Sequence, residues 1–577
     1  MKKTKILFSI LLISSLLGAN FDLLSTYNNS NKRELSFSKI IGIMVEFQYE
    51  ESDDPNTTGR GDFLQDLDID FIDNSGMRCE GFIVDPPPHN QNYFKDQIIS
   101  VSNYLRIASN NNINIQSTDI DVIDIIFQLS GPIRDYSVSD NTIGELFSES
   151  LELAKDNIEN HAFLNEQDID YEDILFVIFH AGVGQDVSFP YLDPTNYDIP
   201  SAYIEENMLS TVSENSWIKE NGVLSGVLLP ETLNHIQYDI VEDLFYGIED
   251  YCDYQLGMTG LFSLLIGYAL DLPVLYNTDD GSAGVGVFGL MDYGSNNGYG
   301  VIPSYINPWT KIMKGWIDSD SPDFGLISIE NDIKRIDISE NEYVLIENRN
   351  NWIQENVSLD SLRNKNKIWS ESYNDSIPGH FFDVLTQELN EDSQIIISDE
   401  TGVILGFDNY DYGLPGSGML IWSINESLIN EESLQSGINN NKENRAIQIK
   451  EADGANDIGN GCYHWNPAVC DILTRGWKYD LWYDDNSEYF YTNPDFNPDS
   501  DVITLNDETN PNLRLNSGAL SLIELNEFSS IGSSMSFNYL NNSSLEIEYI
   551  SNQEIEIKGS GVIDGNGCIF FNDNEFL

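Results

Sequence analysis

The chain has 577 residues, of which 95 are acidic and 28 are basic, and its formal net charge is −67. A field of that sign repels nucleic acid and anionic membrane surfaces, so we expect neither as a partner. With 41% hydrophobic residues, the chain has enough apolar material for packed cores, and its length predicts more than one domain.

The N-terminus is typical of a secretory signal peptide. Lys2, Lys3 and Lys5 form a basic segment, an apolar run covers 6–17, and small residues suited to cleavage end the segment 1–19. That run is too short to span a membrane, and no later run reaches the roughly 18 apolar residues required. We therefore predict a secreted protein, extracellular or at the cell surface, without a membrane span.

The segment 20–320 alternates strand and helix patterns, which predicts an α/β domain. Continuous β-branched apolar runs predict buried strands at 39–47 and 174–179. Apolar residues at helical spacing predict one helix over 93–108 and another that Thr142 caps at its N-terminus. Two more helical patterns lie within 240–270.

The pattern of apolar and polar residues changes after residue 320. Short alternating runs, separated by loops rich in Asn, Asp and Gly, occur at 343–347, 394–398, 419–424, 446–450 and 534–539. This pattern predicts an all-β antiparallel domain over 321–541, built as a sandwich. The tail 542–577 alternates again but is too short for its own core, so it is either an added strand pair or part of a further domain.

Five cysteines in an exported chain permit up to two disulfides and leave one over. Cys462 and Cys470 are close enough in sequence to close a local loop. A bond between Cys79 and Cys252 requires a contact between distant segments, which the sequence does not reveal. No pair has the spacing of a structural zinc site.

Several stretches resemble, in the same order along 39–540, the immune inhibitor A-like family of secreted metallopeptidases (peptidase family M-six). The stretches include DPPPHN at 85–90, FHAGVGQD at 179–186, LDLPVLYNTDDGSAGVGVFGLMDYGS at 270–295, EYVLIENR at 342–349, LPGSGMLIWSINES at 414–427 and IKEADGANDIG at 449–459. The resemblance implies a zincin-like domain of the metzincin type over 20–320. It also implies a zinc signature, His-Glu-x-x-His-x-x-Gly-x-x-Asp, followed by a turn that contains Met.

In such a signature, two His one helical turn apart grip a single zinc, and the Glu takes a proton from zinc-bound water. The aligned positions in this chain are Leu264, Leu265, Tyr268, Asp271 and Val274. None of these side chains can serve as the zinc ligand or the catalytic base that the signature has at its position. No two of the six His are three or four residues apart. We therefore predict no zinc and no catalytic residue.

Two other features bear on the site. Met291 keeps the position of the family's Met-turn, where it can pack beneath the helix. Ser423 stands where the family usually has His, and the sequence assigns it no role. The acidic loops at Asp279 and Asp280 and at Asp453 and Asp457 either hold Ca²⁺ or simply build turns, since Asp suits both.

The sequence therefore predicts a secreted, proteolytically inactive member of this family that binds a polypeptide or a protein partner. Two alternatives remain open. One is an active metalloendopeptidase with a metal site rebuilt from residues distant in sequence. The other is a structural or adhesive surface protein.

Overall fold

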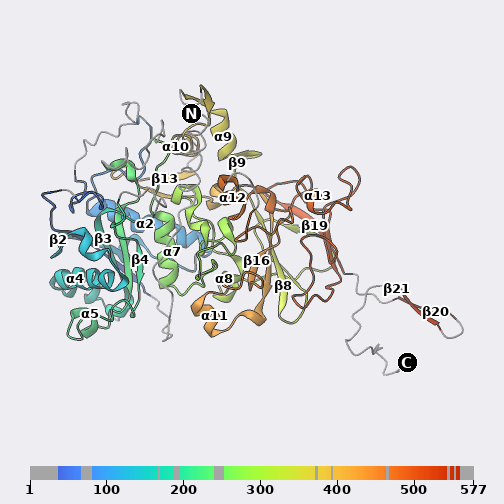
Figure 1. Ribbon diagram of the computed structural model, residues 1–577, viewed down its shortest axis with the longest axis horizontal. Helices are drawn as coiled ribbons and strands as arrows, with labels where there is room; N and C mark the ends of the chain where they lie inside the picture. The colour runs from blue at the N-terminus through green and yellow to red at the C-terminus, as the bar shows by residue number, and fades with distance from the viewer. Residues whose placement is uncertain are drawn as a thin grey trace.

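The computed structural model describes residues 37–541, with gaps at 53, 66–78, 80, 167–168, 187–194, 239–251, 371–373, 392–393 and 463–466, and the segments 546–550 and 554–558. The predicted signal peptide lies outside these residues. A mostly parallel sheet lies at one end of the molecule and antiparallel strands at the other, with helix α7 (Thr259–Ala269) between them (Figure 1). No helix in the described part of the chain is long and apolar enough to cross a membrane.

Five strands form the mostly parallel sheet, in the order β2-β1-β3-β5-β4. Their bounds are β1 Lys39–Glu46, β2 Ile120–Gln128, β3 Ile174–Val183, β4 Ala202–Ile204 and β5 Gly226–Thr232. The edge strand β4 runs antiparallel to β5, and the other neighbours are parallel. All residues of β3 and β5 are buried, as expected of a parallel sheet covered on both faces. Both predicted strands are confirmed, although β3 extends further, to Val183.

Helices cover both faces of this sheet. The helices described in this part of the chain are α2 Gln91–Ala108, α3 Ile133–Tyr136, α4 Asp140–Glu159, α5 Trp217–Glu220 and, further along, α8 Pro308–Met313. On one face, the Phe179 ring of β3 contacts Phe94 of α2 and Phe262 of α7, at centroid distances of 4.5 and 6.1 Å. Phe176 points to the other face, because side chains alternate along a strand, and its ring lies 6.4 Å from Trp217 of α5. The α/β prediction for this part of the chain is therefore confirmed.

Helix α4 begins earlier than predicted. Its N-cap is Ser139, whose hydroxyl accepts a hydrogen bond from the Thr142 N–H at 3.4 Å. The Thr142 hydroxyl in turn accepts from the Ser139 N–H at 3.0 Å, which completes a capping box. The prediction that Thr142 caps the helix was wrong, because both ends of such a box are good capping residues and only the backbone geometry separates them.

The described residues of 321–541 form two four-stranded antiparallel sheets, β16-β15-β8-β7 and β17-β18-β19-β6, and three two-stranded pairs. The bounds of the strands in the four-stranded sheets are β6 Gly325–Ile329, β7 Lys334–Asp337, β8 Glu342–Arg349, β15 Gly418–Asn425, β16 Ile447–Ile449, β17 Thr504–Leu505, β18 Ile523–Asn526 and β19 Met535–Asn541. The pairs are β9 Trp352–Gln354 with β10 Val357–Ser358, β11 Ile368–Ser370 with β12 Asp375–Ile377, and β13 Ile395–Ile397 with β14 Ile404–Phe407. All five alternating runs singled out in this region overlap strands. In the tail, β20 (Glu546–Ile550) pairs with β21 (Glu554–Lys558).

The sequence predicted an all-β domain here, and that prediction was wrong. Five helices lie among the strands: α9 Leu359–Lys365, α10 Phe381–Glu391, α11 Glu431–Ser436, α12 Pro467–Leu473 and α13 Tyr489–Thr492. Helix α10 forms because Phe381, Phe382, Leu385 and Leu389 recur at helical spacing and are buried. Short 3-10 segments complete the chain: η1 Ser117–Asp119, η2 Ala162–Asn165, η3 Tyr171–Asp173, η4 His235–Gln237, η5 Gly286–Phe288, η6 Tyr293–Gly300, η7 Tyr410–Gly413, η8 Glu426–Leu428 and η9 Lys478–Asp480.

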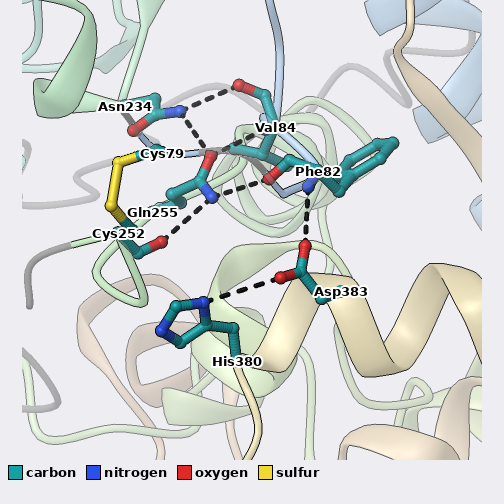
Figure 2. The surroundings of a disulfide bond; sticks show 8 residues. All are labelled: Cys79, Phe82, Val84, Asn234, Cys252, Gln255, His380 and Asp383. Carbon is teal, nitrogen blue, oxygen red and sulfur yellow. Dashed lines mark hydrogen bonds and ion pairs between the residues drawn. A yellow bond between two sulfur atoms is a disulfide. The ribbon is translucent and has the colours of Figure 1, made fainter. Parts of the chain in front are cut away.

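Two disulfides are present, Cys79–Cys252 and Cys462–Cys470, which is consistent with an extracellular location. The first joins segments 173 residues apart in sequence. Beside it, the Gln255 amide donates to the carbonyl oxygens of Phe82 and Cys252 and accepts from the Val84 N–H, so both joined segments are also held by hydrogen bonds (Figure 2). The fifth cysteine, Cys568, lies outside the described residues.

Candidate functional site

Helix α7 is apolar on every side, and all of its residues are buried. A helix of this kind belongs inside a core, because it has no polar face to turn toward solvent. It is packed closely at two glycines. A Cβ on Gly260 would lie 1.9 Å from the Ser295 carbonyl oxygen, and one on Gly267 would lie 2.5 Å from the Met291 sulfur. Met291 therefore lies directly against the helix.

The positions that the resemblance aligns with zinc ligands and the catalytic Glu all lie in this core. Leu264, Leu265, Tyr268 and Val274 expose at most 4% of their surface. The Tyr268 hydroxyl lies 2.8 Å from the Tyr276 hydroxyl, and burial raises the pKa of Tyr276 to about 12 and that of Tyr268 well above its ordinary value. Both phenols are therefore neutral at physiological pH, and neither offers the charge of a carboxylate or thiolate ligand.

The chain turns sharply after the helix. The Asp271 N–H donates to the Tyr268 carbonyl oxygen, and the Leu272 N–H donates to that of Gly267. Asp271 has a φ of +53°, in the left-handed region that favours glycine and that Asp tolerates better than most residues. This is the position that the resemblance aligns with the family's glycine.

The loop that carries Met291 is organised by the next residue, Asp292. Its buried carboxylate accepts hydrogen bonds from the backbone N–H groups of residues 284, 285 and 286 through Oδ2, and from that of Tyr293 through Oδ1. Burial raises the pKa of Asp292 to about 6, against the opposing effect of these hydrogen bonds. The Met291 carbonyl oxygen accepts from the Leu275 N–H, so this loop is also joined to the chain that leaves α7.

A second candidate site lies in the other half of the molecule. Among the described residues, one group of His, Cys, Asp or Glu side chains has the spacing of a metal site: Glu451, Asp453 and Asp480, each with a ligand oxygen within 4.8 Å of the others. Their exposed fractions are 3%, 6% and 0%. Glu451 and Asp453 follow β16, whereas Asp480 ends η9. Asp457 interacts electrostatically with this group, and we call the four residues the acidic cluster.

The acidic cluster is held by backbone and indole donors. Glu451 accepts from the N–H groups of Asp457 and Ile458, at 2.8 and 3.2 Å. Asp453 accepts from the Ala455 N–H and from the Trp477 indole, at 3.0 and 3.1 Å. Asp480 accepts from the Trp477 N–H through Oδ2, at 2.7 Å.

The cluster carboxyls all resist ionisation. Burial, and then the neighbouring acids, raise the pKa of Glu451 to about 8 and that of Asp457 to about 7. Burial also raises the pKa of Asp453, and burial together with the neighbouring charges raises that of Asp480. Like charges held close in a poorly solvated place favour the protonated form unless a cation is present.

The structure brings together Asp453 and Asp457 of the four acids considered for Ca²⁺, and places the other two elsewhere. Asp279 and Asp280 lie in an exposed turn, where Asp280 pairs with Lys442 at 2.8 Å. Burial acts to raise the pKa of Asp280, but the hydrogen bonds from Lys442 and Ser282 outweigh it and lower the value to about 2.

Glu451 and Asp480 were not among the acids predicted to bind Ca²⁺. Glu451 lies two residues before Asp453 and could have been included on spacing alone. Asp480 could not, because only the fold brings η9 next to the loop after β16.

Comparison with known proteins assigns no function. No protein-family model matches the chain, and no curated protein matches it. Helix α7 and the acidic cluster are therefore the features from which function is inferred.

Proposed function

We propose that the chain is an exported member of the immune inhibitor A-like metallopeptidase family that does not cleave polypeptides and acts by binding a polypeptide or protein partner. The single observation that carries this proposal is the complete burial of α7 among apolar side chains at the positions aligned with the zinc site. Without zinc, water is not activated by the lowering of its pKa from 15.7 to about 7, and without the Glu a factor of about 10² to 10⁴ is lost.

The fold supports the zincin-like assignment of 20–320. The mostly parallel sheet has one antiparallel edge strand, β4, and the Tyr203 ring of that strand lies 6.2 Å from the Tyr268 ring of α7. The left-handed backbone at Asp271 and the contact between Met291 and Gly267 are what a zinc-signature helix followed by a Met-turn requires.

A sandwich within 321–541 is supported by aromatic packing between the two four-stranded sheets. Trp482 pairs with Met419 of β15 through backbone hydrogen bonds in both directions. The Trp482 ring lies 5.1 Å from Phe528, which in turn lies 6.2 Å from Phe537 of β19. One continuous row of rings therefore connects the sheets, as a shared core requires.

A cavity of about 360 Å³ offers a place for a bound polypeptide segment. It lies where η6 meets η7 and the helices α9 and α12, and its lining includes Tyr299, Phe381 and Tyr412 together with Arg363 and Arg475. Cavities of this size with aromatic walls and a few polar groups are typical of ligand sites. Arg363 is already paired with Asp253, and Asp360 also lines the cavity, so it is the aromatic walls that favour a segment with aromatic side chains.

The test is metal analysis of the purified full-length chain together with a proteolysis assay on casein. We expect no stoichiometric zinc after mild purification in zinc-containing buffer, and no cleavage with or without added zinc. One tightly bound zinc per chain, lost together with proteolytic activity on chelation, would contradict the proposal and favour a rebuilt metal site.

Binding is tested separately with aromatic peptides derived from casein. Saturable binding that leaves the peptide intact is expected, and Tyr412→Ala should weaken it by removing a ring from the cavity wall. Tyr49→Ala serves as the matched control, since Tyr49 is exposed and lies outside the cavity lining. Self-association or cell-surface retention without peptide binding would favour the structural or adhesive alternative.

A further inference from the structure

The acidic cluster is separate from helix α7 and takes no part in the function proposed above. We propose that Glu451, Asp453 and Asp480, with Asp457 beside them, bind a single Ca²⁺ ion, which joins the loop after β16 to η9. Ca²⁺ takes carboxylate oxygens in irregular loops, which is what these two segments provide.

The spacing of the carboxylates suits Ca²⁺. Ca²⁺ binds oxygen at about 2.3–2.6 Å, so two of its ligands lie at most about 5 Å apart. The three oxygens of Glu451, Asp453 and Asp480 lie within 4.8 Å of one another, so one ion can contact all of them. Mg²⁺ binds at about 2.0–2.1 Å in a stricter octahedron and gives up its water reluctantly, so it fits a buried, irregular set of carboxylates less well.

Asp480 gives an independent indication of a ligand. It is fully buried, and its Oδ1 accepts no hydrogen bond, whereas its Oδ2 accepts from the Trp477 N–H. The Oδ1 atom of Asp457 is likewise shielded from solvent and has no hydrogen-bond donor. Buried polar atoms in native proteins almost always have a partner, and a cation held by the three carboxylates would supply one to the Asp480 Oδ1.

The charged groups around the cluster do not neutralise it. Arg445 interacts electrostatically with Glu451 and with Asp292, but its Nη1 donates to the Ile458 carbonyl oxygen, at 2.8 Å, rather than to a cluster carboxylate. Lys450, the residue before Glu451, interacts electrostatically with Glu342. The indole and backbone of Trp477 contribute dipoles and no charge. Glu451, Asp453 and Asp480 therefore share one buried place, with Asp457 beside them, and no basic side chain in the described part of the chain donates a hydrogen bond to these acids.

Calorimetric titration of the full-length, chelator-treated chain with CaCl₂ tests the site. We expect saturable uptake, and the variant Asp480→Asn should bind Ca²⁺ more weakly by a factor of more than about 100. The control is Asp279→Asn, which removes the same charge from the exposed turn and should leave the affinity unchanged. Absence of saturable Ca²⁺ uptake by the parent chain would overturn the proposal, as would equal affinity of Asp480→Asn.

The dependence on pH provides a second test. Ca²⁺ needs ionised carboxylates, so it should raise the midpoint of thermal unfolding strongly at pH 8 and little at pH 5.

Asp480→Asn also distinguishes a cation site from an acidic cluster that is only structural. Because it removes one of the crowded buried acids and keeps an acceptor for the Trp477 N–H, the metal-free variant should melt above the metal-free parent at pH 8. It should also lose the Ca²⁺-induced rise in melting temperature. A variant that melts lower and still responds fully to Ca²⁺ would overturn the proposal. These readouts involve neither zinc nor peptide cleavage, so they do not depend on the outcome of the proteolysis assay.

Discussion

Replacing Leu265 by glutamate is expected to lower the free energy of unfolding of the α/β part of the chain by more than about 4 kcal/mol. Leu265 has no exposed surface, and it lies within a helix that is buried on every side. The variant loses the burial of a leucine side chain, worth about 1.5–3 kcal/mol. It also has to hold the carboxyl protonated, or pay for a buried charge, at neutral pH. This is the residue that the resemblance aligns with the family's catalytic Glu.

Urea-induced unfolding followed by circular dichroism measures this effect. Leu265→Met is the matched control, because it conserves volume and apolarity and should cost less than about 1.5 kcal/mol. The introduced Glu would have a raised pKa in the folded state, so the cost should grow from pH 5 to pH 8. A cost below about 1 kcal/mol for Leu265→Glu would mean that this position accommodates a carboxylate, which would contradict the proposed structural role of α7.

Asp411→Asn is expected to lower the free energy of unfolding by about 3 kcal/mol, because it leaves a buried arginine without its main counter-charge. The Arg349 guanidinium donates to both carboxylate oxygens of Asp411, with Nη2 to Oδ1 at 2.6 Å and Nε to Oδ2 at 3.0 Å. Both side chains are less than a tenth exposed. Burial acts to lower the pKa of Arg349, but Asp411 and Glu347 outweigh it and raise the value, so the arginine stays charged.

This ion pair also connects the two halves of the chain. Arg349, at the end of β8, donates to the Phe288 carbonyl oxygen and the Ser304 hydroxyl, which flank the loop that carries Met291. Asp399→Asn is the matched control, since Asp399 is exposed, and its loss should change stability by less than about 0.5 kcal/mol. Equal effects of the two variants in urea unfolding would show that the buried pair contributes no more than a surface charge.

Much of the local structure could be predicted from the sequence. The strands β1 and β3, the helix α2 and the apolar face of α4 follow from runs of apolar residues, or from their spacing, within single short segments. The apolar character of α7 was also evident from the sequence, because it depends only on which residues the helix contains and not on what they contact in the fold. The helix α10 was missed, because its helical spacing was overlooked in a region dominated by alternating runs.

The candidate sites divide in the same way. The residues at the positions aligned with the zinc signature were named through the resemblance to the family, because such a signature lies on one short segment. The acidic cluster was only half found, because Asp480 joins Glu451 and Asp453 through the packing of η9 on the loop after β16. Asp279 and Asp280 lie in an acidic loop that was as good a candidate for Ca²⁺ as the loop after β16. The fold leaves these two residues in an exposed turn.

The sequence by itself determined the strands β1 and β3, the helix α2 and the side chains that occupy α7, because these features depend on residues close together along the chain. Only the tertiary structure decided that Cys79 meets Cys252, that Arg349 meets Asp411, and that the acids of two separate loops share one buried place. Such contacts depend on how distant segments pack, and local composition does not encode that. The packing therefore turns a common acidic loop into a candidate Ca²⁺ site.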